Sequence, residues 1–130
     1  MLNGAPVGDE ILVMVFAHWL EPKLHVTEAR IVRAFYALSK RKEHQDILRN
    51  YSFDDDGMEP QCEALSSGLS AMGHSGLLSW DMDFRELTLD QASLRKRSAM
   101  IFGMTGEPIS TLQVLSFTAA FRLELATGDR

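Results

Sequence analysis

A single cysteine, Cys62, is present, so no disulfide can form within the chain. The first residues lack the basic region, apolar run and small-residue cleavage site of a secretory signal. The longest apolar run, Ile11 to Ala17, is far shorter than the roughly 20 residues that span a bilayer. Together these absences predict a cytoplasmic protein with no membrane segment.

The sequence also lacks internal repeats and any long linker rich in Pro, Gly and Ser, which argues against several domains. Its 130 residues are 45% hydrophobic and 24% charged, as is typical of one globular domain. A chain of this length buries about two-thirds of the surface that its unfolded state exposes, which is enough for a stable core without disulfides or bound metal. We expect a flexible lead-in over residues 1–8 and a single domain over 9–130.

The segment 9–20 is apolar on nearly every side, as expected for a helix packed among other helices. Asp9 is placed to cap that helix, and Glu21-Pro22 stands where the element should end. Because the segment is rich in β-branched residues, a buried strand is the alternative.

A second helix is predicted after Thr27, whose hydroxyl can cap it, with Val26 and Ile31 at the two positions of a hydrophobic staple. It is expected to run towards Arg49, with a break near His44. One face of this helix is apolar and carries Ile31, Ala34, Phe35 and Leu38. Another face is a basic stripe that includes Arg30, Arg33, Lys40 and Arg41.

A third helix is expected from Pro60, in its first turn, to Gly73, because apolar residues recur at spacings of four, three, four and three. The members of this narrow stripe are Met58, Cys62, Leu65, Leu69 and Met72. The stripe predicts that Cys62 is buried as a small apolar side chain rather than acting as a nucleophile.

The segments 77–80 and 84–89 favour a β-hairpin around the acidic turn 81–83. Asp90 can then cap a fourth helix, which is expected to be interrupted between Gly103 and Gly106. The predicted fold is therefore mainly α with one β-hairpin.

Three helices, a hairpin and a further helix follow one another in the order of a winged-helix domain, with additional helices at the N- and C-terminal ends. Over roughly residues 27–90 the pattern comprises Tyr51-Ser52-Phe53, a turn with Gly57 and Pro60, the Leu65, Leu69 and Met72 helix, and Gly76-Leu77-Leu78. This pattern resembles small bacterial winged-helix proteins of the Panacea antitoxin type and, more loosely, the middle components of three-component ATPase defence systems. The resemblance implies a protein that binds another macromolecule rather than a catalyst.

The charge distribution argues against DNA binding through the third helix. A winged helix that reads DNA needs donors for bases and phosphates on that helix and on its hairpin. No Lys or Arg lies between Pro60 and Gly76, and the hairpin tip carries Asp81 and Asp83. A net charge of -5 adds to the objection, because neutralising phosphates supplies most non-specific affinity.

Basic residues gather elsewhere: residues 28–50 hold six Lys or Arg against three Asp or Glu, and Arg95-Lys96-Arg97 form a second group. Three interpretations stay open: solvated helix faces, contacts with an acidic protein surface, or contacts with nucleic acid. The candidate contact residues are Arg30, Arg33, Lys40, Arg41, Arg95, Lys96 and Arg97.

Metal and catalytic chemistry find little support. Counted from Ser52, a twelve-residue calcium loop would place Asp54, Asp56, Gly57 and Glu63 suitably, yet serine replaces the first acidic ligand. An acidic turn that caps the next helix is favoured instead. No paired Cys or His spacing, phosphate-binding glycine motif or nucleophile elbow occurs, so we expect no catalytic residue, metal or cofactor.

The final element, 108–125, has more apolar surface than one amphipathic face requires. Such a helix can pack on its own core and also on a second subunit, so Leu112, Leu115 and Phe121 are candidate partner-binding residues. We therefore expect an accessory or inhibitory subunit, in a bacterial or phage system, that binds another protein chain as a homodimer or hetero-complex. The alternative is a DNA-binding regulator that uses the basic helix 28–49, and an enzyme is the third possibility.

Overall fold

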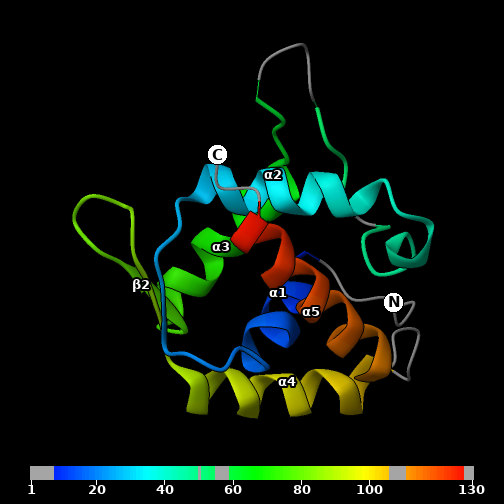
Figure 1. The fold of residues 1–130 in the computed structure, drawn as a ribbon. Helices are drawn as coiled ribbons and strands as arrows, with labels where there is room; N and C mark the ends of the chain where they lie inside the picture. The colour runs from blue at the N-terminus through cyan, green and yellow to red at the C-terminus, as the bar shows by residue number, and fades with distance from the viewer. Residues whose placement is uncertain (1–7, 50, 55–58, 106–110, 128–130) are drawn as a thin grey trace.

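The computed structural model describes residues 8–49, 51–54, 59–105 and 111–127, with side chains described over 10–101 and 112–126 within those ranges. The described chain is mainly helical, with one small antiparallel sheet (Figure 1). In chain order its elements are α1 (Gly8–Ala17), β1 (Lys23–Leu24), α2 (Glu28–Ser39), the short 3-10 helix η1 (Lys42–His44), α3 (Glu63–His74), β2 (Leu78–Trp80), β3 (Leu87–Leu89), α4 (Gln91–Thr105) and α5 (Thr111–Thr127).

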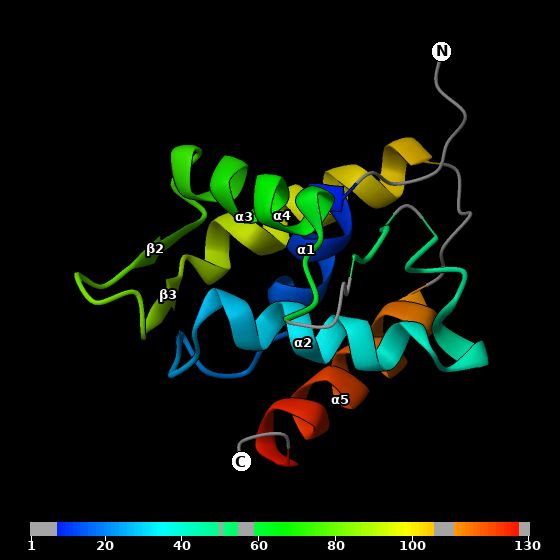
Figure 2. The ribbon, with the colours of Figure 1, turned by 90° about the horizontal axis from the view of Figure 1, so that it is seen from above.

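The first helix, α1, lies at the centre of the molecule, in contact with α3, α4 and α5 (Figures 1 and 2). Every side chain from Ile11 to Ala17 is buried, which confirms a helix surrounded by others and excludes the buried strand. The helix already includes Gly8, so Asp9 lies inside it and the expected N-cap was wrong. Of the expected lead-in, residues 1–7 lie outside the described ranges.

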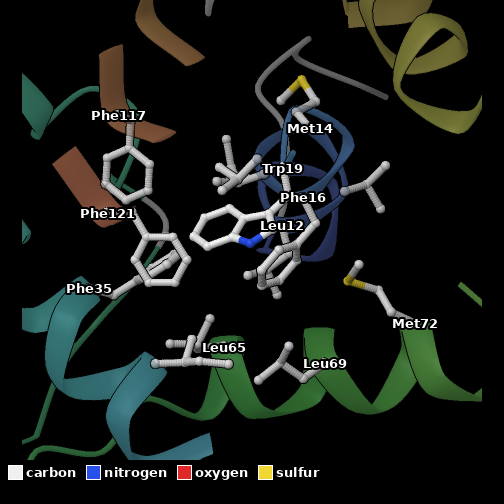
Figure 3. Close-up of a cluster of buried hydrophobic side chains, with 14 of the residues drawn as sticks. Leu12, Met14, Phe16, Trp19, Phe35, Leu65, Leu69, Met72, Phe117 and Phe121 are labelled. Atoms are coloured by element: carbon white, nitrogen blue, oxygen red, sulfur yellow. The ribbon is translucent and has the colours of Figure 1, made fainter. Parts of the chain in front are cut away.

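An aromatic cluster joins α1 to α2 and α5 (Figure 3). The Phe35 ring of α2 lies 5.1 Å from the Phe117 ring and 5.0 Å from the Phe121 ring, both on α5. Trp19, just after α1, lies 5.4 Å from Phe121. Each such side chain contributes about 1.5–3 kcal/mol when fully buried, so this cluster fixes α5 against the rest of the fold.

The second helix begins as the sequence predicts. The Thr27 hydroxyl accepts a hydrogen bond from the Arg30 backbone N–H at 3.3 Å. The expected apolar face is buried, but the helix ends at Ser39 and its continuation is the short 3-10 helix and turns, a larger departure than one break near His44.

The third helix starts at Glu63 with Cys62 as its N-cap residue, so Pro60 lies before it rather than in its first turn. The described members of the apolar stripe, Cys62, Leu65, Leu69 and Met72, are buried, while Met58 lies outside the described ranges. The helix ends at His74 with Ser75 as its C-cap residue, and Gly76 follows with a φ of 78°, which favours glycine. There the Leu77 N–H reaches back to the Met72 carbonyl at 2.9 Å and turns the chain into the hairpin.

The hairpin of β2 and β3 is confirmed, with Ser79 opposite Thr88. The short strand β1 pairs with β3, which gives the strand order β1-β3-β2. Sequence patterning missed β1 because two residues are too few to show alternation. The hairpin projects from the helical body (Figures 1 and 2).

Asp90 caps α4 as expected, since its carboxylate accepts the Ser93 N–H at 3.2 Å. The helix continues to Thr105, so the interruption expected from Gly103 was wrong at that residue, whereas Gly106 lies outside the described ranges. A single glycine costs a helix only about 1 kcal/mol relative to alanine, which the packing of α4 on α1 can override.

Candidate functional site

Two residues of the expected basic stripe, one in α2 and one just after it, form contacts with α5. The Arg30 guanidinium donates to the Leu125 carbonyl near the end of α5. Farther along, Arg41 lies 3.4 Å from the Glu124 carboxylate. These contacts join residues 95 and 83 positions apart in the sequence, so these two basic residues have a structural role.

The other two stripe residues also have contacts within the chain. Arg33 donates to both oxygens of Glu59, at 2.9 and 3.1 Å. The Lys40 ammonium lies 4.4 Å from the centre of the Tyr36 ring. A partner that binds this stripe would therefore compete with contacts that the protein already makes.

The second basic group, Arg95, Lys96 and Arg97, is exposed on α4. Consecutive residues of a helix are about 100° apart, so these three side chains spread over about 200° of its circumference. Leu94 and Ser98, directly before and after, are buried. The three charges therefore do not form one concentrated patch.

The outward surface of α3 carries small or polar side chains and no Lys or Arg. Its exposed residues are Glu63, Ser67, Ser70, Ala71, Gly73 and His74. The hairpin tip beside it holds Asp81, whose pKa is lowered because its carboxylate accepts the backbone N–H groups of Glu86 and Arg85. The sequence-based objection to DNA therefore applies to a real, exposed surface.

The outer face of α5 is apolar and carries no charge. Leu112 and Leu123 are 76% and 62% exposed, and Leu115 is 44% exposed. The remaining exposed residues on this helix are Ser116, Ala119 and Ala126. At 100° per residue, all six fall within about 100° of one another around the helix, and Figure 2 shows α5 at the edge of the molecule.

Of the three apolar residues that the sequence nominates for partner binding, Leu112 and Leu115 lie on this outer face. Phe121 is fully buried in the aromatic cluster (Figure 3). Leu123 was missed, because the sequence shows that this helix has two apolar sides but not which one the core takes.

Two hollows flank α3. One, of about 550 Å³, lies between the starts of α2 and α3 and is lined by Glu28, Glu59 and Glu63, among others. The second, of about 380 Å³, lies between α3 and the hairpin, with Trp80 and Phe84 in its wall. Sequence patterning offered no signal for either hollow, because each is formed by segments distant in the chain.

The hairpin tip holds two exposed apolar side chains, Met82 at 95% and Phe84 at 65%. Phe84 has a φ of 57°, which is costly for a residue with a side chain. The conformation is held because the Phe84 N–H donates to the Asp81 carbonyl at 3.1 Å and the Asp81 carboxylate accepts two further N–H groups.

In the described part of the chain, no group of three or more His, Cys, Asp or Glu side chains is placed to hold a metal ion. The calcium-loop positions Asp56 and Gly57 lie outside it. Cys62 is buried, as the sequence predicts. His44 is also buried, edge-on to Phe117 with ring centres 5.3 Å apart, and burial lowers its pKa.

None of the described helices combines the length and hydrophobicity that crossing a bilayer requires. Comparison of the chain with models of known families, with curated proteins and with solved structures finds no match.

Proposed function

We propose that residues 8–89 form a winged-helix domain and that α4 and α5 are additions to it. Two observations support this assignment. The elements α1, β1, α2, α3, β2 and β3 follow the winged-helix order. The strands also pair in the order β1-β3-β2, with the first short strand added to the hairpin.

The protein acts as an accessory or inhibitory subunit that binds another protein chain. The single observation that carries this proposal is the uncharged outer face of α5, where three leucines are 44–76% exposed. Large exposed apolar patches mark interaction sites, since covering them removes apolar surface from water. The resemblance to bacterial winged-helix antitoxins and defence components favours the same role in a bacterial or phage cytoplasm, where the lone Cys62 thiol stays reduced.

A protein-binding role allows either a different protein or a second copy of the chain on this face, and the sequence of the face favours a second copy, so the subunit acts as a homodimer. Leu115 and Leu123 lie four residues on either side of Ala119, and Leu112 and Ala126 lie seven residues on either side. Two antiparallel α5 helices related by a two-fold axis at Ala119 would thus place Leu115 against Leu123 and Leu112 against Ala126. The small side chain of Ala119 lets the helices approach, and no like charges meet in the contact.

The size of α5 sets the expected affinity. Its 17 residues span about 25 Å, and a single helix pair of this length falls at the small end of specific interfaces. We therefore expect a reversible dimer with a dissociation constant on the order of micromolar.

Sedimentation velocity over a range of concentrations tests the proposal. We expect the wild type to shift from monomer to dimer as concentration rises, and Leu123→Asp to stay monomeric because a carboxylate would be buried unpaired. Met82→Asp is the matched control, since it adds the same charge at an exposed apolar position on the hairpin. A wild type that stays monomeric at about 100 μM, or a dimer that Leu123→Asp leaves intact, would contradict the proposal.

A DNA-binding regulator is the second candidate, and the exposed Arg95, Lys96 and Arg97 favour it, although their charges are spread around α4 rather than gathered on one face. Phosphate contacts would make duplex binding weaken steeply with salt. Fluorescence anisotropy with a labelled duplex, comparing wild type with Lys96→Glu, distinguishes the two candidates.

A further inference from the structure

The two hollows beside α3 follow one another along that helix. Both are lined by Glu28, at the start of α2, so they meet at this residue. Glu63 lines the first hollow, and Ser70, Gly73, Trp80 and Phe84 line the second. We call these two adjoining hollows together the α3 groove.

One end of the α3 groove is acidic. Glu63 lines it, Glu28 lies at its inner limit, and Glu59 also lines it but already accepts two hydrogen bonds from Arg33. Neither hollow has a Lys or Arg among its described lining residues. The Glu28 carboxylate accepts the Ser66 hydroxyl at 2.7 Å, which fixes its position, and a carboxylate has further lone pairs for a cationic donor.

The other end is aromatic. The Trp80 and Phe84 rings lie 6.3 Å apart, and Ser70 and Gly73 opposite them are small. Phe84 keeps its unfavourable φ of 57°, a conformation that is costly for a residue with a side chain. Because the Asp81 hydrogen bonds hold this turn, the ring stays at the groove while more than half exposed.

We propose that the α3 groove binds an extended peptide segment of a partner protein, with a Lys or Arg at the acidic end and a bulky apolar side chain at the aromatic end. Glu63 lies seven residues before Ser70 and ten before Gly73, which is about 10–15 Å along a helix. An extended chain covers that distance in about three to five residues. The same carboxylates repel phosphate, so the peptide is favoured over nucleic acid.

The probe is a fluorescein-labelled peptide, Lys-Arg-Ser-Ser-Ser-Leu-Phe-Ser, titrated with the full-length protein and followed by anisotropy. Two comparison peptides carry Glu-Glu in place of Lys-Arg or Ser-Ser in place of Leu-Phe. We expect the first peptide to bind at least fivefold more tightly than either, and increasingly weakly as salt rises. Equal binding of all three peptides, no binding at about 1 mM, or competition by duplex DNA would overturn the proposal.

Two variants locate the site. Glu28→Gln keeps the acceptor for Ser66 but removes the charge, and Phe84→Gly removes the ring while relieving the positive φ. Each should weaken peptide binding at least fivefold, and Phe84→Gly should not lower the midpoint of thermal unfolding. If either variant binds the peptide as the wild type does, the site is not this groove.

The α3 groove and the outer face of α5 lie on different elements, so the inference does not depend on dimer formation. Leu123→Asp should abolish self-association and keep peptide binding. Glu28→Gln should keep self-association and weaken peptide binding at least fivefold. The failure of one proposal therefore leaves a different signature from the failure of the other.

Discussion

The helices α1 and α5 carry similar sequence patterns, since both are apolar on more than one side, yet the fold treats them differently. The described side chains of α1 from Ile11 to Ala17 are all buried, because α3, α4 and α5 pack around it. In α5, Val114, Phe117 and Phe121 are buried, whereas Leu112 and Leu123 are largely exposed. Apolar residues all round a helix thus indicate several packing partners, without showing whether they belong to the same chain.

The largest expected effect is on folding. Leu12→Ala in α1 should lower the free energy of unfolding by about 2–5 kcal/mol, because it leaves a cavity where the side chain is fully buried. The same change at the exposed Leu123 should alter monomer stability by less than about 0.5 kcal/mol. Urea denaturation at a low protein concentration measures both. Similar losses for the two variants would show that the outer face of α5 packs within its own chain.

A smaller effect concerns pH. Burial lowers the pKa of His44, which packs on Phe117 of α5, with Glu43 opposing the shift and Arg41 adding to it. Burial and the nearby Arg95 also lower the pKa of His18, just after α1. The unfolded state therefore binds more protons below about pH 6.5, so the free energy of unfolding should fall as the pH drops through that value.

His44→Gln should flatten this dependence, with His74→Gln, at an exposed position, as the matched control. The outer face of α5 contains no titratable side chain among its exposed residues, so self-association should change little over the same range. Chemical denaturation at several pH values measures the first quantity and sedimentation the second. A stability that is constant or rises towards pH 5 would contradict the assignment.

Local features of the sequence were sufficient for much of the fold. The hydroxyl of Thr27 and the carboxylate of Asp90 each cap a helix by accepting a hydrogen bond from a backbone N–H only three residues later in the sequence. The stripe through Leu65, Leu69 and Met72 identifies the inner face of α3 because one period repeats along a single helix.

What the sequence could not predict depends on contacts between distant segments. The Arg30 guanidinium donates to the Leu125 carbonyl, 95 positions away in the sequence. The sequence therefore gives no sign that this residue of the basic stripe has a contact within the chain. The choice of Phe121 over Leu123 for the core follows from where α2 and Trp19 lie. The strained turn at Phe84 was likewise hidden, because a positive φ at an aromatic residue leaves no compositional signal.

The proposed dimer requires that a second copy of the chain covers the outer face of α5, and a cysteine at the proposed two-fold axis tests this most directly. Cys62 is buried and should not interfere. Under mild oxidation, Ala119→Cys should form a disulfide-linked dimer much faster than Lys96→Cys, an exposed control on α4, because only the former would bring two Cα atoms within about 7 Å. Equal or slower cross-linking of Ala119→Cys would contradict the proposed pairing of the two helices.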